Sequence, residues 1–404
     1  MANLTAIVED TVRRERGRIV GGLLRLCGSL DAAEEAFQEA ALAALGAWKD
    51  EVPRNPGAWL MTAAKNSARD ARRHHAIVDA KTPLLAEDDM HETIDTLSDD
   101  YLRLVFTCCH PELSIDNAIA LTLKVVAGFS TEEIARAFVC TEATISQRIL
   151  RAKQTIAGLA YATPERDELA ARVDAALGVL YAMFNEGHTA RAGELMRLDL
   201  QAEALRLGRL LCDLVPAEPE AYALVAIMAF SAARAHTRVD AEGAPILLAA
   251  QDRSRWNNEL VREGLMALVR ARSLGGRGPY VLQAEIAAVH VTAPAWDRTD
   301  WPAIVPLYDE LAAIAPSPVV SLNRAVAIAM RDGPAAGLAA LAGLERSLGD
   351  YHLFYATRAD LLDRAGKDPR ADLRKALSLV TNDGERQLLE RRLRARESPP
   401  GRDA

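Results

Sequence analysis

Residues 128–156 constrain the fold most, because they read as two short helices joined by a tight turn. Ser130, with Glu133 three residues later, forms a capping-box pattern, in which each side chain satisfies a backbone N–H at the start of a helix. Thr141 can cap a second helix, which we place at residues 142–156. The stretch therefore predicts a helix-turn-helix.

The second of these helices has two distinct faces. Its apolar positions recur at helical spacing and predict one inward stripe, formed by Ile145, Ile149, Ala152 and Ile156. The other face holds residue types that bond phosphates and base edges in a major groove. The expected DNA contacts from this helix are Thr144, Ser146, Gln147, Arg148, Arg151 and Lys153. An ordinary helical hairpin with a polar outer face is the alternative.

An acidic helix lies near the N-terminus, where Asp31 caps a predicted helix that runs to Trp48. Its apolar side, which includes Phe37, predicts burial against neighbouring helices. Its early turns are expected to expose Glu34, Glu35, Gln38 and Glu39. The alternative is that these acidic residues only complement the helix dipole at the start of the helix. That would account for one or two carboxylates better than for an acidic face that extends over several turns.

A basic helix follows the turn at residues 53–56. Residues 54–75 hold five Lys or Arg against Asp70 alone, a local balance of +4 with His neutral. A basic helix with an aromatic residue at its start suits backbone tracking and base stacking on a single strand. The candidate contacts are Asn55, Trp59, Lys65, Asn66, Arg69, Arg72 and Arg73. A solvated basic face without a ligand is the alternative.

Residues 76–100 reverse the sign, with eight Asp or Glu and only Lys81 against them, and predict an acidic linker. Residues 101–127 return to a helical pattern with a break at Pro111. The formal charge of the chain is −8, which does not exclude nucleic acid, because the local field decides binding.

Residues 166–392 read as a succession of Ala- and Leu-rich amphipathic helices, so the fold class is all-α. The segments that begin at Ser317 and Asp350 superimpose at an offset near 33–34 residues, the period of two-helix repeats stacked in a solenoid. Polar clusters interrupt these helices. They either converge on a ligand or cap and join helices, and Asp252 and Asp300 favour the capping role.

Several classes of function are disfavoured. The five cysteines are scattered, and Cys108, Cys109 and His110 are adjacent rather than spaced as zinc ligands, so we expect buried thiols and no metal. No window is apolar enough for a membrane span, which predicts a cytoplasmic protein. Nucleotide-loop, metalloprotease and serine-hydrolase motifs are absent, so we expect neither an enzyme nor a cofactor.

The order of these segments resembles a bacterial alternative sigma factor of the extracytoplasmic-function group, over about the first 160 residues. The resemblance implies that the basic helix melts and reads the −10 element of promoter DNA and that the helix-turn-helix reads the −35 element. It also implies core RNA polymerase as a partner, through its β′ clamp helices and its β flap. The residues that would dock on the clamp helices are Asp31, Glu34, Glu35, Gln38 and Glu39.

The chain departs from typical members by its length, and the extension resembles a subgroup with a long tetratricopeptide-like helical C-terminal domain. The implied domains are a region 2-like domain at 1–76, an acidic linker at 77–98, a region 4-like domain at 99–160, a helical-repeat domain at 165–395 and a disordered tail at 396–404. We expect a sigma factor regulated in cis, through contact of the C-terminal domain with the sigma domains. The alternative is a stand-alone helix-turn-helix regulator with a ligand- or peptide-sensing solenoid.

Overall fold

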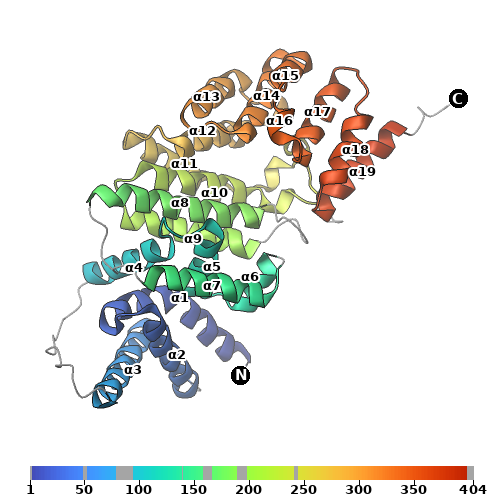
Figure 1. Ribbon diagram of the computed structural model, residues 1–404. Helices are drawn as coiled ribbons and strands as arrows, with labels where there is room; N and C mark the ends of the chain where they lie inside the picture. Colours follow the sequence, from blue (N-terminus) through green and yellow to red (C-terminus); the bar gives the residue numbers. More distant parts are fainter. Residues whose placement is uncertain are drawn as a thin grey trace. The chain divides into compact units, whose positions relative to one another are not determined.

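The computed structural model describes residues 2–48, 52–78, 94–138, 140–157, 166–188, 198–240 and 244–397. Within these ranges the regular elements are helices, which confirms the all-α expectation (Figure 1). The chain divides into two compact units, Met1–Ala182 and Met183–Ala404, and each is described by itself. Most of the acidic linker and the last residues of the tail lie outside the described ranges.

The N-terminal unit begins with three helices that pack on one another. They are α1 (Ala2–Cys27), α2 (Leu30–Ala47) and α3 (Pro56–Val78). Leu23, Phe37 and Leu60, one from each helix, are fully buried in their common core. The cap of α2 differs from the prediction, because the side chain of Ser29, not Asp31, accepts the N–H of Ala32.

Four further helices follow in this unit. They are α4 (Ile94–Cys108), α5 (Ile115–Val125), α6 (Thr131–Ala137) and α7 (Glu142–Ala157). Helix α4 begins within the segment assigned to the linker and packs along α1. Cys108 and Cys109 are buried where α4 ends, as expected, and burial raises the pKa of Cys109 to about 12.

The helix-turn-helix forms as predicted. Glu133 N–H donates to Ser130 Oγ at 3.0 Å, and Ser130 N–H donates to Glu133 Oε2 at 2.6 Å, which is a complete capping box at the start of α6. Thr141 Oγ1 accepts the N–H of Thr144 at 3.2 Å and caps α7. The predicted stripe of α7 is buried at all four positions, and α7 packs on α5 and α6.

The C-terminal unit is a chain of helices, most of which pack on their neighbours in sequence, while α12 also packs on α10 (Figure 1). Helix α8 (Arg166–His188) crosses the boundary between the units. The α-helices that follow are α9 (Leu198–Leu214), α10 (Pro219–Ala233), α11 (Asn258–Ser273), α12 (Pro279–Thr292), α13 (Trp301–Ile314), α14 (Pro318–Asp332), α15 (Pro334–Ala340), α16 (Glu345–Leu348), α17 (His352–Arg364), α18 (Arg370–Leu379) and α19 (Asp383–Glu397). Short 3-10 turns lie at Ala235–Thr237, Leu248–Ala250, Arg253–Arg255 and Trp296–Arg298.

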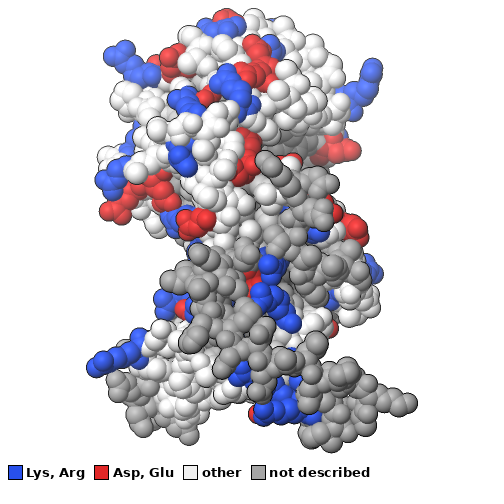
Figure 2. Space-filling view, turned by 90° about the vertical axis from the view of Figure 1, so that its left-hand side faces the viewer, with Lys and Arg blue, Asp and Glu red and all other residues white. Residues whose placement is uncertain are grey.

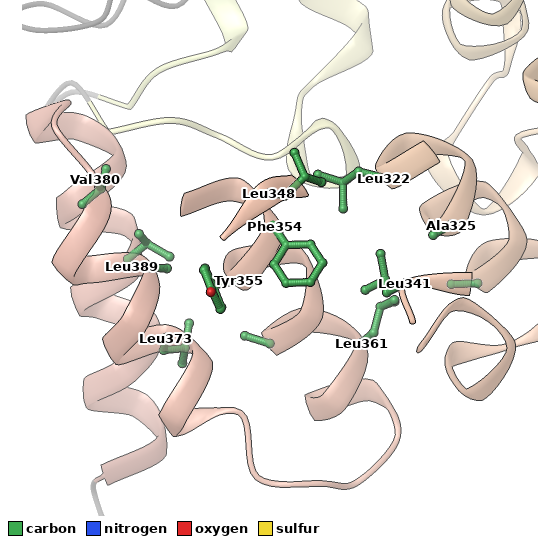
Figure 3. Packing of buried hydrophobic residues seen from close by; sticks show 13 residues of the cluster. Leu322, Ala325, Leu341, Leu348, Phe354, Tyr355, Leu361, Leu373, Val380 and Leu389 are labelled. Carbon is green, nitrogen blue, oxygen red and sulfur yellow. The ribbon is translucent and has the colours of Figure 1, made fainter. Parts of the chain in front are cut away.

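The internal repeat seen in the sequence has a structural counterpart. Gly333 follows α14 at φ +98° and Gly366 follows α17 at φ +71°, so both equivalent positions need a backbone that favours glycine. Ala325 and Ala359, which also correspond, are both fully buried. Figure 3 shows Phe354 inside the cluster that joins these last helices.

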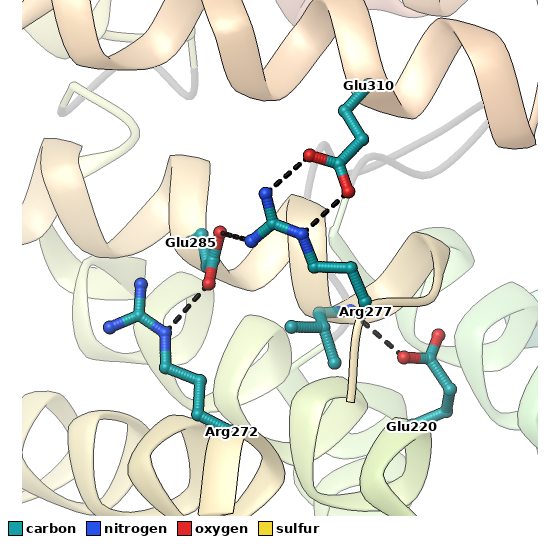
Figure 4. Close-up of polar contacts among 6 residues, drawn as sticks. Glu220, Arg272, Arg277, Glu285 and Glu310 are labelled. Carbon is teal, nitrogen blue, oxygen red and sulfur yellow. Dashed lines mark hydrogen bonds and ion pairs between the residues drawn. The ribbon is translucent and has the colours of Figure 1, made fainter. Parts of the chain in front are cut away.

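Polar side chains join the helices of the C-terminal unit. Glu285 is buried and accepts from Arg272 at 2.7 Å and from Arg277 at 3.4 Å, while Arg277 also pairs with Glu310 on α13 (Figure 4). Glu220, in the first turn of α10, accepts the backbone N–H of Tyr280 at 2.8 Å and so satisfies the start of α12. These polar residues stabilise the contacts between helices.

The capping roles predicted for two aspartates are confirmed. Asp252 accepts from the N–H and hydroxyl of Ser254, and Asp300 accepts the N–H of Ala303 at 3.1 Å. Arg253 donates to the carbonyls of His290 and Ala293 and ties this turn to the end of α12.

Candidate nucleic-acid interface

Helix α3 presents a continuous basic face. Leu60, Ala64 and Ala68 are buried on its inner side, which fixes the rotation of the helix. On the outer side, the exposed candidates are Asn66, Arg69, Arg72 and Arg73, and Lys65 is half-buried. Four of the seven candidates on this helix and the turn before it are therefore exposed on one surface, where Arg73 also pairs with Asp70 at 3.7 Å.

The two candidates at the start of α3 also hold structure. Asn55 Oδ1 accepts the N–H of Ala58 at 3.1 Å and caps the helix. The ring of Trp59 packs edge-on against Trp48, with 5.3 Å between ring centroids, and Trp48 is buried. Trp59 is half-buried, so part of its side chain remains exposed.

Helix α7 exposes most of its predicted recognition face. Because the stripe from Ile145 to Ile156 is buried, the opposite side faces solvent. The exposed candidates are Thr144, Ser146, Gln147 and Arg151. Arg148 is half-buried and pairs with Asp116 on α5 at 3.3 Å, so its guanidinium is partly engaged within the domain.

The acidic face of α2 is less open than the sequence predicts. Glu34 is only 5% exposed and pairs with Arg16 of α1, so the expectation that it is solvent-exposed is wrong. The exposed members of the set are Asp31, Glu35, Gln38 and Glu39. Glu39 accepts the hydroxyl of Ser67 on α3.

Lys153 lies with the acidic residues of α2. Its Nζ is 2.6 Å from Asp31 Oδ1 and 2.7 Å from Glu34 Oε2. Desolvation alone would lower the pKa of Lys153, but the hydrogen bonds and charges of Asp31 and Glu34 outweigh it and raise that pKa. The ammonium group therefore stays charged and serves two carboxylates at once.

A cleft of about 420 Å³ lies between α2 and α7, lined by residues that include Gln38, Lys124, Ser146, Lys153 and Gln154. Because a basic residue in the last turn of a helix such as α5 is common, no role was predicted from the sequence for Lys124. Burial lowers its pKa, and the nearby Arg16 lowers it further. No local sequence pattern predicts the set of residues that lines this cleft, because they come from helices that are distant in sequence.

One face of the molecule shows a difference in charge between the described residues of the two units. On the face drawn in Figure 2, mostly basic charges are seen over the N-terminal unit, whereas both signs are interspersed over the C-terminal helices. Among the described residues, no helix is both long and apolar enough to cross a membrane.

Comparison with known families matches three parts of the chain. Residues 11–77 match sigma-70 region 2, residues 103–156 match sigma-70 region 4, and residues 172–272 match a family of unknown function (DUF6596). The first two matches cover α3 and α7 with their candidate faces. No solved structure matches the chain.

Two relatives bear on the identity of the chain. An uncharacterized protein of Rhizobium meliloti (strain 1021) is 41% identical over 393 residues, which cover 94% of this chain and 93% of the relative. The RNA polymerase sigma factor CarQ of Myxococcus xanthus is 34% identical over 137 residues, 31% of this chain and 73% of CarQ. Sigma-70 domains imply interactions with core RNA polymerase and promoter DNA, and sigma factor families are not enzymes. The chain thus belongs to the sigma-70 family of RNA polymerase sigma factors, as an extracytoplasmic-function type with a long helical part after region 4.

Proposed function

We propose that three surfaces of this sigma factor divide the work of promoter recognition. The acidic face of α2 docks on the β′ clamp helices of core RNA polymerase, through Asp31, Glu34, Glu35, Gln38 and Glu39. The basic face of α3 melts and reads the −10 element. The outer face of α7 reads the −35 element, while its domain contacts the β flap.

The observation that carries this proposal is the pair of exposed, partly basic helix faces, one in each sigma domain. On α3, Arg69, Arg72 and Arg73 are exposed next to Asn66, so phosphate contacts and base contacts can come from one surface. On α7, Gln147 and Arg151 are the exposed groups best suited to base edges. The remaining candidates are Asn55, Trp59 and Lys65 around α3 and Thr144, Ser146, Arg148 and Lys153 on α7.

The helical C-terminal unit is proposed to regulate the sigma domains in cis. It is covalently tied to them, and the family matched within it has no assigned function. A helical-repeat scaffold can present or mask a neighbouring domain without any chemistry of its own. Truncation before Arg166, followed by measurement of polymerase binding and transcription, tests this role, and unchanged values in both would exclude it.

Run-off transcription tests the promoter-reading surfaces. The template is the upstream region of the protein's own gene, and the other component is purified bacterial core RNA polymerase. The double substitution of Arg69 and Arg72 by alanine should abolish initiation, because it removes two phosphate-binding charges from α3. Arg394→Ala, at an exposed arginine of α19, is the matched control and should leave initiation unchanged. Full initiation by the double variant would contradict the assignment of α3.

A further inference from the structure

A cluster of cationic side chains lies at the turn that follows α10. Arg234 ends this helix, and Arg253 begins the 3-10 turn that precedes α11. Both guanidinium groups lie over the ring of the buried Trp256, at 6.0 and 4.7 Å from its centroid. Two like charges are thus held against one indole, within the segment that matches a family of unknown function.

Neither arginine of this cluster forms an ion pair with a carboxylate among the described residues. The pKa of Arg234 is lowered to about 10, because burial removes water from the guanidinium and the charge of Arg253 repels it. Burial also lowers the pKa of Arg253. By contrast, Arg358 pairs with Glu345 and Asp372, and its pKa is raised. The positive charge at the end of α10 is therefore not compensated as it is elsewhere in the same unit.

Polar atoms of the cluster are buried without a hydrogen-bond partner among the described residues. They are Arg234 Nε, Arg253 Nη2 and His290 Nδ1. Arg253 uses its other terminal nitrogen, Nη1, to donate to the carbonyls of His290 and Ala293, which fixes the orientation of Nη2. Burial, and then the charges of both arginines, lower the pKa of His290 to about 4, so its imidazole is neutral near pH 7. Guanidinium groups only donate and a neutral imidazole can donate one N–H, so the set matches a ligand that accepts hydrogen bonds.

A third arginine adds to the positive charge. Burial, and then Arg234, lower the pKa of Arg238 to about 9, and the charge of Glu385 on α19 offsets this only in part. Asp240, two residues later, pairs with Arg391 at 2.9 Å. The two guanidinium groups on the indole belong to half-buried side chains, so a small ion can approach them from solvent.

We propose that this cluster binds a phosphate group, carried by inorganic phosphate or by a small phosphomonoester, between Arg234, Arg253 and His290. A phosphate group accepts charge-assisted hydrogen bonds from guanidinium groups. It brings about −1.5 to −2 charges and three acceptor oxygens, whereas a carboxylate brings one charge and two oxygens. Once bound, it joins the end of α10 to the end of α12 and stabilises this part of the C-terminal unit. The site lies wholly in that unit, so its occupancy does not depend on the proposed promoter-reading surfaces.

Isothermal titration of the full-length protein with inorganic phosphate tests the site. Ionic strength is held constant with chloride, because screening acts on every surface charge. We expect saturable binding, weakened at least about ten-fold in Arg234→Gln, since a hydrogen bond to a charged group is worth at least about that factor. Arg255→Gln is the matched control: it removes the same charge from an exposed position in the same turn and should bind phosphate as the unsubstituted protein does.

A second titration with glycerol 3-phosphate distinguishes the two sources of the phosphate group. Tighter binding than inorganic phosphate assigns the site to a phosphomonoester, and equal or weaker binding assigns it to the free ion. Absence of saturable binding of both probes to the unsubstituted protein would overturn the proposal, and this result depends on no variant. An equal loss in Arg234→Gln and Arg255→Gln would also overturn it, because the effect would then be one of general charge.

Thermal unfolding separates a phosphate ligand from an arginine that only packs. Without phosphate, Arg234→Gln should unfold at the same temperature as the unsubstituted protein or higher, because it removes a charge that lacks a partner. With saturating phosphate, the unsubstituted protein should unfold at the higher temperature, since only its folded form gains the ligand. Exclusion of phosphate from the protein surface stabilises both proteins alike and does not change their order. A midpoint of Arg234→Gln that is lower by the same amount with and without phosphate would refute the site.

Discussion

Substitution of Ser130 by alanine should loosen the first helix of the helix-turn-helix. The Ser130 hydroxyl accepts the N–H of Glu133 at 3.0 Å, and no other side chain in the described contacts of this turn replaces it. Loss of such an N-cap costs about 1 kcal/mol. If α6 opens locally, its amides should exchange with solvent about five-fold faster, since 1.4 kcal/mol corresponds to a factor of ten.

Hydrogen exchange with mass spectrometry on the full-length protein measures this change peptide by peptide. Glu133→Gln is the matched comparison, because it keeps an oxygen that can accept the N–H of Ser130 and removes only the charge. The Glu133 side chain is about one-third exposed, so this variant should cost less than the loss of the cap. Unchanged exchange in Ser130→Ala, or an equal effect in Glu133→Gln, would refute the reasoning.

The same helix should respond to acid in a defined direction. Desolvation raises the pKa of Glu133, but hydrogen bonds from the Ser130 N–H and from Arg13 outweigh it and lower that pKa below its usual value. A lowered pKa in the folded protein stabilises it above the unfolded value of about 4.3, and this contribution is lost as the pH falls through the folded value. The measurement is the protection of the α6 amides from hydrogen exchange, corrected for intrinsic exchange rates. As the pH is lowered, this protection should fall less in Glu133→Gln than in the unsubstituted protein.

Three further outcomes are expected. Phe354→Ala should destabilise the C-terminal unit by about 3–5 kcal/mol in urea unfolding, because it removes a ring from the centre of the cluster in Figure 3. Met266→Ala is the control: its side chain is 67% exposed, so the free energy of unfolding should change by no more than about 0.5 kcal/mol. Gly333→Ala should cost about 1–3 kcal/mol in the same assay, because φ is +98° there. Arg69→Ala and Arg72→Ala should each weaken promoter DNA binding at all sequences and reduce the salt slope by about 1, measured by titration of the polymerase complex.

Local patterns predicted the elements whose partners lie within a few residues. The capping box of Ser130 and Glu133 needs only its own turn, and the stripe of Ile145 and Ile149 needs only a helical period and a core to face. Both were confirmed.

Long-range pairing could not be predicted. Glu34 reads as an exposed acid on an amphipathic helix, and its burial depends on Arg16 and on Lys153, which lies on a different domain. Arg148 similarly reads as a free recognition residue, whereas Asp116 of α5 engages it. No periodicity or composition connects residues so far apart, so the contact between the sigma domains is visible only in the structure.

The cap of α2 shows a smaller failure with a different cause. Serine and aspartate are both good N-cap residues, and Ser29 and Asp31 stand two positions apart. The choice depends on where the preceding chain leaves the helical conformation. Gly28, at φ +71°, ends α1 in the left-handed region and places Ser29 at the cap. Asp31 then falls in the first turn, where its charge suits the helix dipole.

The carboxylate of Glu220 has a consequence for how the C-terminal unit comes apart. In an array where each helix touches only the next, unravelling can stop at any boundary. Here α10 supplies the hydrogen-bond acceptor for the first turn of α12 at 2.8 Å, and the side chain fits against Gly278, where a Cβ would lie 2.5 Å away. Helix α11 packs on α10 and lies in the sequence between two helices that are fastened to each other, so α10, α11 and α12 should melt as a single cooperative block rather than one helix at a time.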